Sequence, residues 1–149
     1  MIALLQRVKH ANVTVDEKII GQINQGLLVF LAVEPNDTTA HAQRLAERVL
    51  GYRIFSDDAD KMNLSVKDIQ GELLIVSQFT LAADTAKGMR PSFTTAAPPA
   101  LGKELYNYFV ACCQKLYCEN KIATGQFGTN MQVSLCNDGP VTIILQTNI

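Results

Sequence analysis

The order of apolar and polar positions in the first third of the chain is typical of short antiparallel strands. Apolar residues alternate with polar ones or form brief runs, and turn-forming residues separate these segments. Asp16-Glu17-Lys18 and Asn24-Gln25-Gly26 are the two tight connections. The last segment is apolar throughout, which predicts burial on both of its faces. The predicted strands are Ile2–Val8, Asn12–Val15, Ile19–Ile23 and Leu27–Val33.

Two later segments have the period of amphipathic helices. The first follows a cap formed by Pro35-Asn36-Asp37-Thr38 and ends at Gly51, with apolar residues at i, i+3, i+4, i+7 and i+8. The second begins at Pro98-Pro99, because proline suits the first turn of a helix. The predicted core-facing residues are Ala42, Leu45, Ala46, Val49 and Leu50 in the first helix, and Leu101, Leu105, Tyr108, Phe109, Cys112 and Leu116 in the second.

The remaining segments predict further strands and one long loop. Arg53–Phe55 and Leu73–Phe79 have strand character, and two final strands, Met131–Cys136 and Val141–Gln146, are joined by a turn. The irregular stretch Ala82–Ala97 is long for a compact domain, and such loops are often functional. The pattern predicts one α+β domain over residues 1–149, a mostly antiparallel β-barrel or two packed sheets with two outer helices.

Composition narrows the class of protein. With 149 residues, 48% of them hydrophobic and 18% charged, the chain is long and apolar enough for one core. No apolar run approaches the roughly 20 residues of a membrane helix, and no signal peptide pattern opens the chain. We therefore expect a soluble, cytoplasmic protein. A formal net charge of -1 argues against attraction of nucleic acid over the whole surface, so a local basic cluster would have to hold it.

Cysteine and histidine usage argues against metal and histidine chemistry. The spacing of the four cysteines does not match a zinc site, so they are expected to be buried thiols in a reducing cytoplasm. The chain has only two histidines, and neither lies in a metal or nucleophile motif. No metal ion or cofactor is predicted. The four cysteines are Cys112, Cys113, Cys118 and Cys136.

Ser77-Gln78-Phe79-Thr80 places polar side chains where a buried strand ends and the long loop approaches. Hydroxyl and amide groups can orient a carbonyl or a ribose, and neighbouring backbone N–H groups can form an oxyanion hole. The alternative is that these side chains only bond to nearby backbone.

Asn137-Asp138-Gly139-Pro140 is the second unusual segment. These are turn-forming residues, and an ordinary hairpin turn is one interpretation. A cis peptide before Pro140, which would direct backbone carbonyls, is the other. In the long loop, Lys87 and Arg90 beside Met89 and Phe93 predict either a basic and apolar lip for a nucleic-acid end or ordinary surface cations.

Taken together, the motifs resemble those of the D-aminoacyl-tRNA deacylases, close to the bacterial members. The similarity covers essentially the whole chain and departs from the family pattern at few positions. Thr129 stands where alanine is expected, and Thr147-Asn148-Ile149 lengthens the tail. The matching segments are Gln6-Arg7-Val8, Ser77-Gln78-Phe79-Thr80-Leu81, Gly88-Met89-Arg90-Pro91-Ser92-Phe93, Met131-Gln132-Val133-Ser134-Leu135 and Asn137-Asp138-Gly139-Pro140-Val141-Thr142.

The resemblance implies hydrolysis of the ester between a D-amino acid, or glycine, and the 3′-terminal adenosine of tRNA. It implies a homodimer with active sites at the interface, in which a cis Gly139-Pro140 peptide enters the partner's pocket and excludes L side chains. Arg7 is expected to brace that peptide, Met131 and Phe127 to contact substrate, and Ser77 and Gln78 to position the adenosine and ribose.

Two questions of chemistry stay open at the level of sequence. Thr80 is a candidate nucleophile, yet neither motif supplies a histidine or lysine base, so attack by water aided by the ribose 2′-hydroxyl is preferred. Backbone amides at Phe79 and Thr80 would then stabilise the oxyanion. Only a few phosphate contacts are expected, from Lys87, Arg90 and Lys61. The rival functions are a nucleic-acid-binding module without catalysis and a hydrolase or deaminase of small metabolites.

Overall fold

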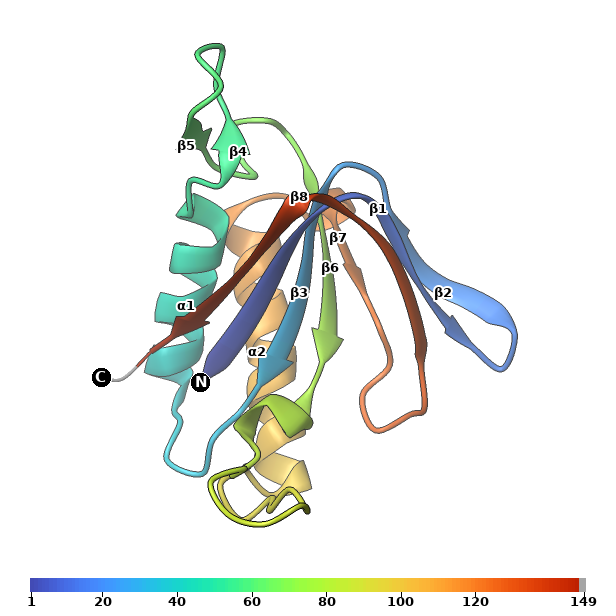
Figure 1. Cartoon of the computed structure of the whole chain (residues 1–149), viewed down its shortest axis with the longest axis vertical. Helices are drawn as coiled ribbons and strands as arrows, with labels where there is room; N and C mark the ends of the chain where they lie inside the picture. Colours follow the sequence, from blue (N-terminus) through green and yellow to red (C-terminus); the bar gives the residue numbers. More distant parts are fainter. Residues whose placement is uncertain (148–149) are drawn as a thin grey trace.

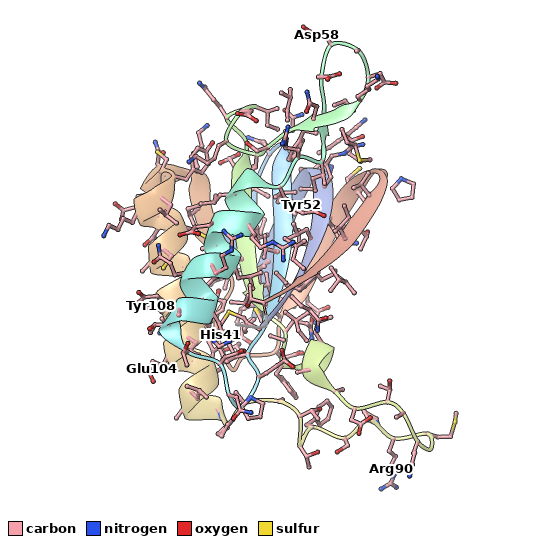
Figure 2. The ribbon with its side chains drawn as sticks, turned by 90° about the vertical axis from the view of Figure 1, so that its left-hand side faces the viewer. His41, Tyr52, Asp58, Arg90, Glu104 and Tyr108 are labelled. Atoms are coloured by element: carbon pink, nitrogen blue, oxygen red, sulfur yellow. The ribbon has the colours of Figure 1, made fainter. Side chains whose placement is uncertain are left out.

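The computed structural model describes residues 1–147, and two of the tail residues noted above, 148 and 149, lie outside the described residues. Most of the strands form one curled sheet, and both α-helices lie side by side on one of its faces (Figures 1 and 2). The elements are β1 Ile2–Val15, β2 Lys18–Ile23, β3 Gly26–Ala32, α1 Thr39–Gly51, β4 Phe55–Ser56, β5 Met62–Leu64, β6 Glu72–Ser77, the 3-10 helix η1 Phe79–Ala82, α2 Pro99–Leu116, the 3-10 helix η2 Glu119–Lys121, β7 Ile122–Thr124 and β8 Gln132–Gln146.

The main sheet has the order β2-β1-β3-β6-β7, with β8 paired along β1, and it is nearly closed into a barrel. The pairs β3–β6 and β6–β7 are parallel, and each needs a long crossover, which contains α1 in one case and α2 in the other. Closure brings β2 against β7, where a Cβ at Gly21 would lie 2.4 Å from the carbonyl oxygen of Thr124. Only glycine fits there. The prediction of a mostly antiparallel α+β domain with two outer helices is confirmed, and of its two alternatives, a barrel or two packed sheets, the main sheet forms the barrel.

Two predicted interruptions are wrong, for one shared reason. The segments predicted as Ile2–Val8 and Asn12–Val15 form the single strand β1, and Asn137–Pro140 lies inside β8 instead of forming a hairpin turn. The two irregular places face each other: the β1–β8 register shifts between Gln6 and Val8 and again before His10. Extra residues in a paired strand bend the ladder without ending it. The turn-forming residues therefore bend a long two-stranded ribbon.

Other boundaries move by small amounts. The small strand pair β4–β5 starts later than the predicted Arg53–Phe55, and its second strand is absent from the prediction, as is β7. The strand predicted as Leu73–Phe79 ends at Ser77, because η1 begins at Phe79. Tyr108 was predicted to face the core but is 39% exposed. The buried aromatic residues of that helix are Tyr106, which was not predicted, and Phe109, which was.

The core has one layer on each face of the sheet. Leu27 and Val29 pack against the helices, whereas Leu28 of the same strand points into the barrel, so the predicted burial of β3 on both faces is confirmed. All five predicted residues of α1 are buried. The four cysteines are free thiols, but only Cys112 and Cys113 are fully buried, and the other two are half-buried. In the described part of the chain, no helix has the length and apolar character needed to cross a membrane.

Candidate active site

The polar motif lies where β6 leaves the sheet. Leu73 to Val76 are buried between β3 and β7, and the chain turns at Gln78 into η1, with the Gln78 N–H donating to the Leu31 carbonyl at 2.7 Å. This bond holds the turn against β3. Ser77 and Gln78 are half-buried, whereas Phe79 and Thr80 are exposed. The Gln78 side-chain amide donates to the Thr80 hydroxyl, so the motif is bonded between its own side chains and not, as the alternative predicted, to nearby backbone.

A cavity of about 490 Å³ opens beside this turn. A volume of that size is typical of small-molecule sites. Its walls come from the ends of β3 and β6, from the 93–99 loop, from the first two turns of α2 and from the loop after β7. The lining residues are Leu31, Val33, Ser77, Phe79, Phe93, Thr94, Ala96, Ala97, Pro98, Pro99, Gly102, Tyr106, Phe127 and Gly128.

Aromatic rings form much of the cavity wall. The rings of Phe79 and Phe93 meet edge to face with their centroids 5.0 Å apart. Phe127 and Tyr106, which also line the cavity, pack with their ring centroids 5.9 Å apart. The first pair has the edge-to-face geometry that aromatic rings prefer, and the second pair is tilted. The cavity therefore presents aromatic surfaces together with the hydroxyl-bearing Ser77 and Thr94.

Tyr106 is the only titratable side chain among the described residues that line the cavity. Its hydroxyl donates to the Ile75 carbonyl at 2.7 Å, which ties α2 to β6. Burial raises the pKa of the Tyr106 phenol far above its ordinary value, so the group stays neutral. None of these described lining residues is an aspartate, glutamate, histidine or lysine. The cavity wall of one chain thus offers neutral hydrogen-bonding groups and no ready base.

The loop that carries Phe127 rests on Met131. The Met131 sulfur accepts from the Gln126 N–H at 3.4 Å, and a Cβ at Gly125 would lie 2.7 Å from the same atom. Met131 packs against the barrel core. Phe127 thus lies in the cavity wall, and Met131 supports the loop from beneath, outside that wall.

The second motif is held rigidly by side chains. The Gly139–Pro140 peptide is cis, and both residues are exposed. The Arg7 Nε donates to the Asp138 carbonyl at 2.8 Å, and the Arg7 guanidinium also donates to the Ile54 carbonyl at 2.8 Å. The Asn137 side chain closes the bulge from within, because its oxygen accepts from the Val141 N–H at 2.7 Å and its nitrogen donates to the Val141 carbonyl at 3.1 Å.

Within one chain, the two motifs lie apart. Arg7, which holds the second motif, is opposite Leu27 of β3, whereas Ser77 is opposite Leu31 of that strand. This interval is about 13 Å along the strands, and the three strand spacings from β8 to β6 add about 14 Å across them. Neither Gly139 nor Pro140 lines the cavity. The fold therefore brings together Ser77, Phe79 and Phe127, and it leaves the Gly-Pro element at the other end of the sheet.

The basic residues named from the sequence divide in the same way. Arg90 lies in the long loop that extends from the cavity end, and the turn with Asp58 and Lys61 lies at the opposite end of the molecule (Figure 2). Sequence reasoning missed Tyr106 and Gly102 as cavity residues. Pro98-Pro99 marked the start of the helix whose first turn carries Gly102, whereas no local signal distinguished Tyr106 from Tyr108.

Known proteins match this chain over nearly its whole length. The family model described as D-Tyr-tRNA(Tyr) deacylase matches residues 4–146. A protein of Pseudomonas fluorescens strain Pf-5 named D-aminoacyl-tRNA deacylase is 60% identical over 99% of this chain and 100% of its own. One of the same name from Haemophilus influenzae strain PittGG is 62% identical over 97% of this chain and 99% of its own.

Two solved structures share the fold. One, named c-Myc DNA Unwinding Element Binding Protein, superposes with a TM-score of 0.96 at 39% identity and covers 100% of both chains. The other, described as a probable eukaryotic D-amino acid tRNA deacylase, has a TM-score of 0.86 at 17% identity over 98% of both chains, a likeness of fold alone. From the match to the family model and the identity to these curated relatives over nearly its whole length, the chain belongs to the D-Tyr-tRNA(Tyr) deacylase family.

Proposed function

We propose that the protein is an editing hydrolase that cleaves the ester between a D-amino acid and the 3′-terminal adenosine of tRNA. The observation that carries the proposal is the aromatic cavity at the end of β6, which begins at Ser77 and Phe79 of the family motif. Aromatic faces suit a purine base. We assign the ribose to Ser77, which lines the cavity, and to the neighbouring Gln78, and both side chains are half-buried.

Stabilisation of the oxyanion falls to backbone amides. The N–H groups of Phe79 and Thr80 open η1, where the first amides of a helix have no acceptor within it. Neither donates a hydrogen bond to another described residue. Amides fixed in this way can stabilise a developing negative charge without rearranging. An aminoacyl ester is already activated, so positioning and these two donors supply the main catalytic effect.

Water, aided by the ribose 2′-hydroxyl of the substrate, is the proposed nucleophile. Threonine attack needs a base that removes the hydroxyl proton. The Thr80 hydroxyl is bonded to the Gln78 amide, which donates a proton and cannot accept one there. Thr80 therefore positions substrate in the proposed mechanism and forms no covalent intermediate.

Selection against L-amino acids is assigned to Gly139 and Pro140 of a second copy of the chain. The proposal is supported by the exposure of both residues and by the Arg7 and Asn137 bonds that hold them. It is also supported by their distance from the cavity of their own chain. A rigid backbone wall rejects every L side chain while leaving a D side chain in open space, and glycine has no side chain to reject. The proposal includes a homodimer with two interface sites and acceptance of glycyl-tRNA. A cytoplasmic location is proposed separately, because tRNA is the proposed substrate.

Gly102 offers a direct test of the cavity. A Cβ there would lie 3.5 Å from the Phe127 ring, an ordinary contact, so Gly102→Ala keeps the cavity open. Gly102→Leu extends a side chain into it. We expect the alanine variant to release D-tyrosine from D-tyrosyl-tRNA within about twofold of the parent rate, and the leucine variant to fall by more than about tenfold. Full activity of a folded leucine variant would contradict this placement of the substrate.

A nucleic-acid-binding function without catalysis is the second candidate, favoured by the DNA binding that the name of the 39% identical solved structure states. Duplex and single-stranded DNA, added as competitors to the D-tyrosyl-tRNA assay, distinguish the two. Submicromolar DNA binding by a protein that leaves D-tyrosyl-tRNA intact would favour the second candidate.

A further inference from the structure

The loop between Asp84 and Ser92 projects from the rim of the cavity as an ordered unit. Two backbone hydrogen bonds close its neck, from Asp84 N–H to the Ser92 carbonyl at 2.8 Å and from Ser92 N–H to the Asp84 carbonyl at 3.0 Å. The Asp84 carboxylate also accepts from the Ala86 N–H at 2.9 Å. Figure 2 shows Arg90 at the far end of this loop, away from the sheet and the helices.

The neck is joined to the catalytic motif. Phe93 directly follows it and packs its ring against Phe79. The Thr95 hydroxyl donates to the carbonyl of Ala82, the last residue of η1. The loop therefore starts from the same wall that would hold the terminal adenosine, and its orientation is fixed relative to that wall.

The tip of the loop carries exposed apolar and basic side chains that make no ionic contact within the described fold. Met89 is 99% exposed, and Lys87 and Arg90 on either side of it are exposed as well. Within the described residues, neither cation forms an ion pair or a hydrogen bond. The nearest carboxylate in the loop, Asp84, is occupied at the neck. In a chain of net charge -1, the tip is thus a local pair of free cations around an apolar side chain.

We infer that this tip binds the unpaired 3′ strand of tRNA about two to three nucleotides before the terminal adenosine, an inference that rests on the proposed function. Lys87 and Arg90 contact phosphates, and Met89 packs on a base or sugar. The reach agrees: three residues from Phe93 to Arg90 span at most about 10 Å, and a stacked strand advances about 3.4 Å per nucleotide. Because phosphate contacts carry no sequence information, the tip would hold the acceptor ends of different tRNAs alike.

The test compares Lys87→Ala/Arg90→Ala with a control of equal charge loss, Lys18→Ala/Lys115→Ala, whose exposed lysines lie at the start of β2 and on α2. Each protein is assayed for kcat/KM on D-tyrosyl-tRNA and on the D-tyrosyl ester of adenosine. The salt slope is the fall of log(kcat/KM) per unit rise in the logarithm of the salt concentration. The loss of two phosphate contacts on a single strand makes this slope smaller by about 1.4. Between about 50 and 200 mM salt, the parent and the control should therefore lose about sevenfold more activity on tRNA than the loop variant does.

The short substrate separates the tip from the cavity. We expect all three proteins to hydrolyse the adenosine ester within about twofold of one another, and Met89→Ala to weaken only the reaction with tRNA. Equal salt slopes for parent and loop variant would overturn the inference. An equal loss of activity on both substrates would also overturn it, because the loop would then support the structure of the cavity. An altered sedimentation coefficient of the loop variant would overturn it too, because the tip would then be a contact between copies of the chain.

Failure of the proposed function gives a different result. In that case the parent protein hydrolyses neither substrate. Fluorescence anisotropy with labelled, uncharged tRNA then tests the tip without catalysis, under the same two salt conditions. A salt slope that the loop variant reduces and the control leaves unchanged supports the inference, and unchanged binding by the loop variant contradicts it.

Discussion

Replacing Tyr106 by phenylalanine tests whether the cavity works without a protein base. Tyr106 is the only titratable side chain among the described residues of the cavity wall, and its hydroxyl donates to the Ile75 carbonyl. In the proposed mechanism this phenol has a structural role only. Tyr106→Phe keeps the ring and its packing on Phe127, so kcat/KM for D-tyrosyl-tRNA should stay within about twofold of the parent value.

The cost in stability follows from the hydrogen bonds at Ile75. A buried intramolecular hydrogen bond contributes about 0.5–1.5 kcal/mol to the free energy of unfolding. The Ile75 carbonyl also accepts from the Gly125 N–H at 3.1 Å, so it keeps one partner in the variant. We therefore expect a loss at the lower end, about 0.5–1 kcal/mol. For a domain of this size, that corresponds to a fall in Tm of about 1–4 °C.

Calorimetry and urea unfolding measure this loss, and Tyr108→Phe on the exposed side of the same helix is the matched control. The pH dependence has a definite sign. Burial raises the pKa of Tyr106 in the folded protein. The contribution of its phenol to folding stability is therefore fully present below the ordinary tyrosine pKa of about 10 and is lost as pH rises above that value. The phenylalanine variant should lose less stability in that range. A hundredfold fall in kcat/KM at unchanged Tm would refute the reasoning, because the phenol would then act on the reacting atoms.

Three further substitutions probe the motifs and the surface. Thr80→Ala should keep at least about a third of the single-turnover rate on D-tyrosyl-tRNA, and complete loss in a folded variant would point to a covalent role. Gly139 has φ +151°, and an added Cβ would lie 2.7 Å from the backbone nitrogen of Val141. Gly139→Ala should therefore lower the free energy of unfolding, measured in urea, by about 1–3 kcal/mol. An unchanged unfolding midpoint would contradict this. The pKa of Asp68 is lowered, chiefly by the hydrogen bond from the Ser65 N–H. The contribution of Asp68 to folding stability is therefore present above about pH 4 and is lost as pH falls through the lower pKa of the folded state. Asp68→Asn should therefore show a shallower loss of stability in acid, and parallel acid-unfolding curves would exclude this role.

The sequence predicted what depends on local periodicity. Helix α1 was predicted with its buried face because apolar side chains at the helical period leave few alternatives. The buried β3 was predicted for the same kind of reason, since seven residues without a polar interruption are rarely exposed. The polar end of β6 was also visible from the sequence, as a strand that turns hydrophilic before a long loop.

The rest depends on pairing between distant segments. Nothing local tells that Asn137–Pro140 continues a strand, because the register shifts of β1 decide it. Strands as short as β7 pack only through neighbours already in place, so their composition carries little signal. Tyr106 belongs to the cavity because α2 crosses the end of β6, and helix period alone does not distinguish it from Tyr108.

The proposed editing activity is tested most directly by incubating the purified protein with D-tyrosyl-tRNA and, in parallel, with L-tyrosyl-tRNA. We expect rapid release of D-tyrosine, while the L-ester decays no faster than in buffer. Equal hydrolysis of both esters would contradict the assignment of a chiral wall to Gly139 and Pro140. Release of neither amino acid above the buffer rate would contradict the enzyme activity itself.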